Sequence, residues 1–230
     1  MAAARDDLPG AVVEAAGDRR GGATEVARRA LDGLLEIAGD RERLAAAADL
    51  LLEGQPAMAP VWHLARAARS ADPAAALAEL RERLDRETGA AAETAARWLR
   101  NRLGSPAGPV ATVSHSSLVD AVLERLGPPE TRGRPAVALV GADAIGPRAL
   151  LNAAGTRLLA ARLPTLVVST RLKLVPAGVF ARLAAPGFEV VPLDLVDAVV
   201  LGPELLAPGA AGRRAAALSQ ARGSTRSSTP

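Results

Sequence analysis

The sequence Val140-Gly-Ala-Asp-Ala-Ile145, followed by Asn152-Ala-Ala-Gly-Thr156, decides the expected fold of this 230-residue chain. It places one carboxylate, Asp143, just after the apolar run of residues 136–140, whose valines favour a buried strand. In open α/β sheets, ligands bind outside the carboxyl ends of the strands. The stretch therefore predicts a ligand site beside Asp143.

Around this stretch, short apolar runs alternate with segments of helical character, beginning after the Gly- and Pro-rich boundary at residues 104–109. Such an alternation is typical of a mainly parallel sheet with helices on its faces. The expected strands are residues 110–113, 136–140, 165–168, 188–191 and 198–201, and the expected helices are residues 117–126 and 147–162.

Before the boundary, apolar residues recur at helical spacing, and Thr24 and Asp72 stand where N-caps are expected. The expected helices there are residues 24–38, 40–52, 59–69 and 73–103. The fold class is thus α/β, with an N-terminal helical domain (residues 1–104) and a Rossmann-like, mainly parallel sheet domain (residues 105–208). Residues 209–230 are rich in Gly, Ser, Arg and Thr, and this composition predicts a disordered tail.

Composition excludes several classes of function. The net charge is only +3, the arginines are scattered between acidic residues, and aromatics make up 2% of the chain, so nucleic acid is not an expected partner. No apolar run approaches the length of a membrane span, and residues 1–10 lack the apolar centre of a signal peptide, so we expect a cytoplasmic protein. Cysteine is absent, and His63 and His115 lie far apart in sequence. Neither a metal site nor a cofactor is therefore expected.

Polar residues follow three of the expected strands, and the carboxyl ends of parallel strands converge on one edge of a sheet. Ser116 and Ser117 begin a helix whose free N–H groups favour an anion, and Lys173, the single lysine of the chain, can add a cation. Each residue type also suits a structural role, such as an N-cap, a turn or a solvated surface. The candidate ligand-binding residues are Arg20, Ser116, Ser117, Asn152, Gly155, Thr156 and Lys173, and the candidate catalytic residues are Asp143 and Ser116.

The order of these motifs resembles the superfamily of the alpha, beta and delta subunits of initiation factor 2B. That superfamily includes methylthioribose-1-phosphate isomerase and ribose-1,5-bisphosphate isomerase. The resemblance runs collinearly over residues 21–200. The matching pieces are Gly22-Ala23, Gln55-Pro-Ala-Met-Ala-Pro-Val-Trp62, Val113-Ser-His-Ser-Ser117, Gly141-Ala-Asp-Ala-Ile145, Asn152-Ala-Ala-Gly-Thr156 and Ser169-Thr-Arg-Leu-Lys173.

The resemblance implies a helical domain, a Rossmann-like domain and a homodimer. In the isomerases it implies proton transfer between an aldose and a ketose 1-phosphate by a Cys and by the Asp of the Gly-Ala-Asp motif. This sequence departs from that pattern, since Ser116 stands in place of the Cys and Ala153 in place of a substrate-holding Lys. The segment between Leu126 and Pro135 is also short by about 40 residues, roughly one strand–helix–strand unit.

Three hypotheses follow from this resemblance and its departures. The leading one is a non-catalytic protein, similar to initiation factor 2B, that binds a phosphorylated sugar or nucleotide. The second is a sugar 1-phosphate isomerase that uses Asp143 together with Ser116 or water. The third is a regulatory or scaffold subunit of a translation-related complex.

Overall fold

The computed structural model of the chain describes residues 7–104, 108–113, 116–128 and 133–220. It is an α/β structure with a helical N-terminal part and a mainly parallel sheet, as expected from the sequence. The elements in chain order are α1 (Gly10–Gly17), α2 (Ala23–Glu36), α3 (Arg41–Gly54), α4 (Ala59–Ala68), α5 (Pro73–Leu103), β1 (Val110–Ala111), α6 (Ser117–Leu126), β2 (Val137–Val140), β3 (Ala144–Ile145), β4 (Ala149–Ala153), α7 (Thr156–Ala160), β5 (Thr165–Ser169), η1 (Arg171–Lys173), α8 (Ala177–Phe180), β6 (Phe188–Pro192), η2 (Leu193–Leu195), β7 (Ala198–Leu201), β8 (Glu204–Leu206) and α9 (Pro208–Gln220).

Helices α2 to α5 coincide with the four expected helices to within about two residues, whereas α1 was not expected. The Asp72 carboxylate accepts a hydrogen bond from the backbone N–H of Ala75 at 3.0 Å, so the expected cap of α5 is confirmed. The expected cap of α2 is wrong. Gly22 is the N-cap without a side-chain hydrogen bond, and Thr24 lies buried inside the helix because its side chain packs into the helical part.

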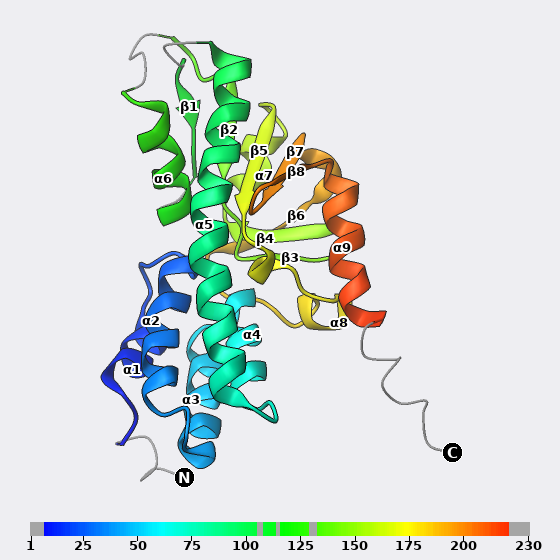
Figure 1. Cartoon of the computed structure of the whole chain (residues 1–230). Helices are drawn as coiled ribbons and strands as arrows, with labels where there is room; N and C mark the ends of the chain where they lie inside the picture. The colour runs from blue at the N-terminus through cyan, green and yellow to red at the C-terminus, as the bar shows by residue number, and fades with distance from the viewer. Residues whose placement is uncertain (1–6, 105–107, 114–115, 129–132, 221–230) are drawn as a thin grey trace.

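Helix α5 joins the two parts of the molecule (Figure 1). It is 31 residues long, and its first half buries Leu77 and Leu84 in the apolar cluster formed by α1 to α4. Its second half buries four alanines and a leucine against the sheet and α6: Ala91, Ala92, Ala95, Ala96 and Leu99. The division of the chain into domains at residues 104 and 105 stays a prediction, because the helix before that point packs into both halves.

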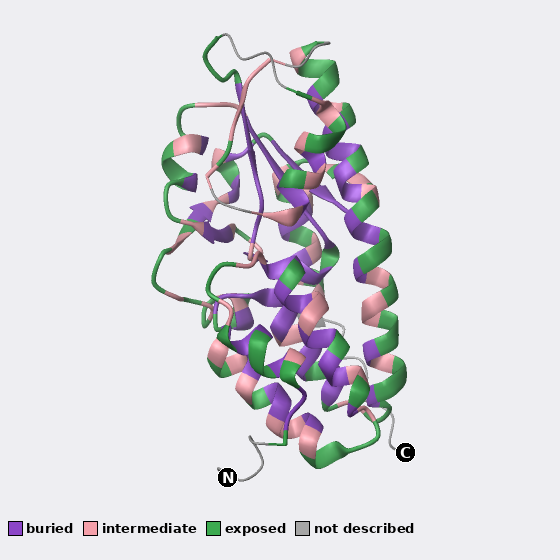
Figure 2. Cartoon of the chain, turned by 90° about the vertical axis from the view of Figure 1, so that its left-hand side faces the viewer, coloured by how far each residue is buried: buried purple, intermediate pink, exposed green. Residues whose placement is uncertain are grey.

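The main sheet has the strand order β1-β2-β5-β7-β8, in which the first four strands are parallel and β8 pairs antiparallel with β7. Alternate residues of its central strands face two different apolar clusters. Leu139, Leu166 and Val200 pack against α5 and α6, whereas Val167 and Val199 pack toward α7 and α9. The central strands are therefore buried on both faces, as Figure 2 shows by their purple colour.

A second, antiparallel sheet of order β3-β4-β6 was not expected. Residues 147–162 were expected to form one helix, and this prediction is wrong. Residues 149–153 form β4, which pairs with β3 on one side and β6 on the other, and only residues 156–160 are helical. Cross-strand pairing and burial of Leu150 and Leu151 override the helix propensity of alanine and leucine.

The expectation of a disordered tail from residue 209 is wrong for residues 209–220, which belong to α9. Ala211 and Ala215 are fully buried in the cluster that also contains Val199 and Leu201 of β7. Docking of this small-residue face onto the sheet is what orders the helix. The remaining residues of the expected tail, 221–230, lie outside the described residues.

Candidate functional site

Three neighbouring parallel strands bring Ser116, Asp143 and Lys173 to the same edge of the main sheet. Each residue follows one strand: β1, β2 and β5 respectively, which lie side by side in that order. A Cβ atom at Gly141 would stand 3.1 Å from the Ser116 Oγ. From the other side, Lys173 Nζ donates a hydrogen bond to the carbonyl oxygen of Ala142 at 2.6 Å. The segment that leads into Asp143 is therefore held between Ser116 and Lys173.

Asp143 and Lys173 form an electrostatically coupled pair. Burial raises the pKa of Asp143 above its ordinary value, and the nearby Lys173 ammonium opposes that rise. Burial lowers the pKa of Lys173, and the Asp143 carboxylate opposes that fall. Lys173 is only 5% exposed, so it is a buried residue and not the solvated lysine that was the alternative.

Ser116 is the N-cap of α6. Its hydroxyl accepts a hydrogen bond from the backbone N–H of Val119 at 3.4 Å, and its backbone carbonyl accepts from Asp120 N. The neighbouring Ser117 Oγ is buried and has no hydrogen-bond partner among the described residues. The helix predicted at residues 117–126 is confirmed, and with it the capping role that serine suits. His115, which directly precedes Ser116, lies outside the described residues.

Asn152, Gly155 and Thr156 shape the turn between β4 and α7. Asn152 Nδ2 donates to Thr156 Oγ1 at 2.9 Å, and that hydroxyl donates to the carbonyl oxygen of Ala153 at 2.7 Å. Gly155 has a φ of 98°, a left-handed conformation that favours glycine, and it is the N-cap of α7. Their polar groups are thus engaged within the turn.

A cavity of about 550 Å³ lies between the helical part and the end of the sheet. Two of the candidate residues, Arg20 and Asp143, line it, one from each half of the chain. The other candidates are not among its lining residues. The complete lining is Asp18, Arg19, Arg20, Gly21, Gly22, Glu53, Gly54, Gln55, Pro56, Ala57, Met58, Asp143, Ala153, Ala185, Pro186 and Phe188.

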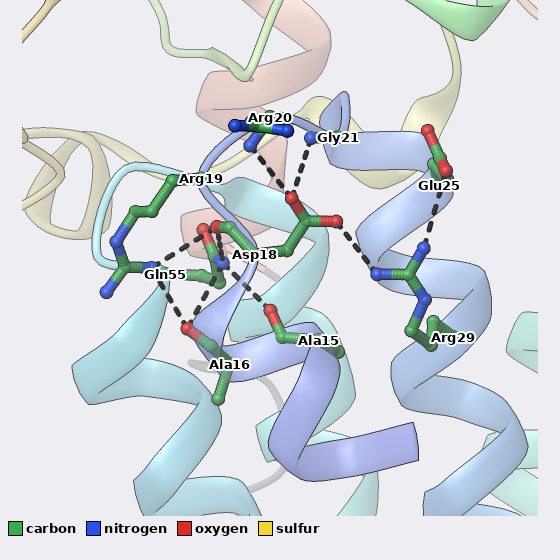
Figure 3. Close-up of polar contacts among 9 residues, drawn as sticks. All are labelled: Ala15, Ala16, Asp18, Arg19, Arg20, Gly21, Glu25, Arg29 and Gln55. Atoms are coloured by element: carbon green, nitrogen blue, oxygen red, sulfur yellow. Dashed lines mark hydrogen bonds and ion pairs between the residues drawn. The ribbon is translucent and has the colours of Figure 1, made fainter. Parts of the chain in front are cut away.

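One wall of the cavity is the loop of residues 18–22, which leads into α2 (Figure 3). Asp18 Oδ1 accepts hydrogen bonds from the backbone N–H groups of Arg20 and Gly21, both at 2.8 Å, and Asp18 Oδ2 accepts from Arg29 Nη1 at 2.8 Å. The hydrogen bonds from Gly21 and Arg20, together with the Arg29 guanidinium, hold the pKa of Asp18 below its ordinary value. Asp18 is therefore a charged anchor of the loop.

Gln55 supports the same loop from the end of α3. Its carboxamide Nε2 donates to the carbonyl oxygens of Ala15 and Asp18, at 2.8 and 2.6 Å, and more weakly to Ala16. The side chain is buried, so these bonds satisfy carbonyl groups that the end of α1 leaves free. Sequence reasoning missed Asp18 and Gln55 as members of the site. The Asp-x-x-Gly spacing of Asp18 and Gly21 is a local turn signal that could have indicated the first.

The cavity has two chemically different sides. Arg20 and the N-terminus of α2, which has no side-chain cap, favour an anionic group. Ala57, Met58 and Phe188 form an apolar side, and Asp143 adds one titratable carboxyl. The arrangement suits a small molecule with an anionic end, an apolar portion and a polar group near Asp143.

No family model matches the sequence, and no curated protein matches it. Among solved structures, the translation initiation factor eIF-2B of Pyrococcus horikoshii OT3 aligns with a TM-score of 0.68 and 19% identity, over 87% of this chain and 98% of its own. The chain has the eIF-2B fold.

Two further structures with the eIF-2B fold extend this result. The tetrameric eIF2B beta2-delta2 complex of C. thermophilum aligns with a TM-score of 0.61 and 14% identity, over 92% of this chain and 93% of its own. The 5-methylthioribose 1-phosphate isomerase of Pyrococcus horikoshii OT3 gives 0.58 and 15%, over 90% and 87%. The resemblance seen in the sequence motifs is thus confirmed as a common fold.

In the described part of the chain, no helix has the length and apolar character needed to cross a bilayer.

Proposed function

We propose that the protein binds a small phosphorylated molecule, a sugar phosphate or a nucleotide, in the cavity between its two halves. The main support for this proposal is the lining of the cavity, which combines Arg20 and the start of α2 with the carboxyl group of Asp143. Its volume of about 550 Å³ lies within the range of small-molecule sites. An arginine beside a helix N-terminus provides charge-assisted hydrogen bonds to phosphate oxygens.

Two of the three acidic residues that line the cavity, Asp18 and Asp143, oppose an anion less strongly than free carboxylates would. The charge of Asp18 is compensated by Arg29, which donates a hydrogen bond to Oδ2, and Oδ1 already accepts hydrogen bonds from two backbone N–H groups. Burial raises the pKa of Asp143, which increases the fraction of its uncharged form. Both effects reduce the repulsion that a bound phosphate meets.

We propose that this binding is not accompanied by sugar isomerisation. Ser116 is a weaker acid than the Cys of the isomerases, and its hydroxyl is used as the cap of α6. Ser116 also does not line the cavity, and Lys173 Nζ is bonded to the carbonyl oxygen of Ala142. Neither Ser116 nor Lys173 thus serves Asp143 as a second proton-transferring side chain in the cavity.

One observation favours the alternative of an aldose–ketose isomerase. Asp143 lines the cavity, and burial raises its pKa, which is the direction of shift that suits a carboxyl acting as a general acid or base. In this version, Asp143 and a water molecule would move the proton between the two carbon atoms of the sugar.

We further propose a homodimer in the cytoplasm, which leaves a subunit or scaffold role open. The support is the likeness of fold to the subunits of the tetrameric C. thermophilum complex. Size-exclusion chromatography with light scattering measures the number of copies. A monomer at micromolar concentration would contradict the homodimer.

Binding is tested by isothermal titration calorimetry with ribose 5-phosphate, ribose 1-phosphate, adenosine monophosphate and inorganic phosphate. Arg20→Ala is expected to weaken binding about tenfold to a hundredfold, the usual effect of losing a charged hydrogen-bond donor. Arg28→Ala is the matched control, because Arg28 lies on the neighbouring helix, pairs with Asp85 and does not line the cavity. Absence of binding in the unchanged protein, or equal binding by Arg20→Ala, would contradict the proposal.

Catalysis is tested separately by phosphorus and carbon NMR of ribose 1-phosphate incubated with the protein. The non-catalytic version predicts no conversion to the ketose form over hours at high protein concentration. Conversion that is lost in Asp143→Asn would instead establish the isomerase alternative.

A further inference from the structure

The loop that forms the anion-facing wall of the cavity is held in one conformation by contacts from three directions. Within the loop, the Asp18 carboxylate accepts hydrogen bonds from the backbone N–H groups of Arg20 and Gly21. Arg29 of α2 holds the other oxygen of the same carboxylate. From the end of α3, the Gln55 carboxamide donates a hydrogen bond to the Asp18 carbonyl oxygen, as Figure 3 shows.

Asp18 is the residue common to all three sets of contacts. Its side chain is only 12% exposed, whereas most other carboxylates that pair with arginine in the described residues are more than half exposed. An exposed ion pair contributes little, but a half-buried carboxylate with three donors fixes its neighbours more strongly. Arg20, by contrast, is exposed and touches this network through its backbone N–H.

The close packing around the loop leaves it little room to shift. A Cβ atom on Gly21 would stand 2.5 Å from Asp18 Oδ2 and 3.1 Å from Asp18 Cγ. Arg19 Nη1 also donates to the carbonyl oxygen of Gly54 at 2.9 Å, which ties the loop to the last residue of α3. We therefore expect a change at Asp18 or Gly21 to disturb the hydrogen bonds that hold the segment carrying Arg20.

We propose that Asp18, held by Arg29, is a positioning residue that pre-forms the anion-binding wall and thereby sets affinity for the phosphorylated ligand. This inference rests on the proposed function of the cavity. It adds that affinity depends on two side chains that are not expected to touch the phosphate. A loop that is ordered before binding avoids the conformational entropy that a flexible loop loses on binding.

The affinity experiment uses ribose 5-phosphate as the probe and compares Asp18→Ala, Asp18→Asn and Gly21→Ala with the unchanged protein. Asp18→Ala is expected to weaken binding about tenfold or more. In this variant the backbone of at least one loop residue would lose its conformational entropy only when the ligand binds, and that loss lowers the affinity. Asp18→Asn keeps one oxygen that accepts from the backbone and should show a smaller loss. Gly21→Ala retains Asp18 but pushes its carboxylate aside, and it should behave like Asp18→Ala.

Asp85→Asn is the matched control, since Asp85 also pairs with two arginines in the helical part but does not line the cavity. A merely structural role for Asp18 predicts lower thermal stability without a change in the dissociation constant at 15 °C. Equal dissociation constants for Asp18→Ala, Gly21→Ala and the unchanged protein would overturn the proposal.

A second measurement separates this proposal from the function of the cavity. Nitrogen-15 relaxation reports the order of residues 19–22 without any ligand. If the unchanged protein binds none of the phosphorylated probes, the proposed function fails, and the positioning role is judged by relaxation alone. Order parameters that fall at residues 19–22 in Asp18→Ala but not in Asp85→Asn support it, and unchanged values refute it.

Discussion

Glu204 offers a quantitative test of how the end of the chain is held onto the sheet. Its carboxylate, on β8, accepts hydrogen bonds from Arg214 of α9 and from Arg171 of η1, and the Arg214 Nη1 contact is 2.8 Å long. The hydrogen bonds from Arg214 and Arg171 lower the pKa of Glu204 from its ordinary 4.5 to about 2. Glu204→Gln keeps the shape of the side chain and removes its charge.

The pKa shift of Glu204 sets an upper limit on how much its ion pairs stabilise the fold. If the whole difference between 4.5 and about 2 were expressed as stability, it would amount to roughly 3 kcal/mol at pH 7. The two guanidinium groups are 41% and 39% exposed, so water and salt screen the interaction. We therefore expect Glu204→Gln to lower the free energy of unfolding by about 1 kcal/mol.

The pH dependence has a definite sign. Because the pKa of Glu204 is lower in the folded than in the unfolded chain, its stabilisation is complete above about pH 4.5 and is lost as the pH falls toward 2. The assay is urea unfolding of both proteins at pH 7, 5, 4 and 3, with Glu79→Gln as the control. Glu79 pairs with Arg83 on the surface of α5, so Glu79→Gln should lower the free energy of unfolding by less than about 0.5 kcal/mol. A difference between Glu204→Gln and the unchanged protein that stays constant down to pH 3 would refute this reasoning.

Two further changes test the packing of α9 and the coupled pair beside the cavity. Gly212→Ala should destabilise the protein by about 1–3 kcal/mol, because the new Cβ would overlap the carbonyl group of Pro147, whereas Gly209→Ala meets no backbone atom and should be nearly neutral. Urea unfolding checks both, and equal stability of the two variants would mean that α9 does not dock as described. Lys173→Met removes the ammonium that opposes the effect of burial, so the pKa of Asp143 should rise further, as followed by carbon-13 NMR of its carboxyl group. An unchanged or lower pKa would show that the two side chains are not coupled.

Much of the fold could be predicted because the decisive signals are local. The end of α5 near residue 104, the caps of α5 and α6, and the apolar runs of the central strands all lie within short windows of sequence. The parallel order then follows from the alternation of strands and helices. For the same reason the juxtaposition of Ser116, Asp143 and Lys173 could be predicted from topology alone, although the roles of these residues stay predictions.

The errors have a common physical origin in contacts between distant segments. The sequence of β4, Ala-Leu-Leu-Asn-Ala, has helix propensity and becomes a strand through its pairing with β6, some 40 residues later. Helix α9 is ordered by burial of Ala211 and Ala215, which composition does not reveal. In the same way, Gln55 is separated by 40 residues from Ala15, whose carbonyl oxygen it binds.

The continuous helix α5 has a mechanical consequence for access to the cavity. With 31 residues it is about 46 Å long. Its leucines pack into the core of the helical half, and its alanines pack against the sheet half. A hinge between the halves would have to break the helix in its middle, where Glu87 is buried and binds Arg171 through two hydrogen bonds. Because the loop of residues 18–22 is fixed by Asp18 and Gln55, small molecules should enter by movement of the rim at residues 185–186, while the width of the cavity stays constant.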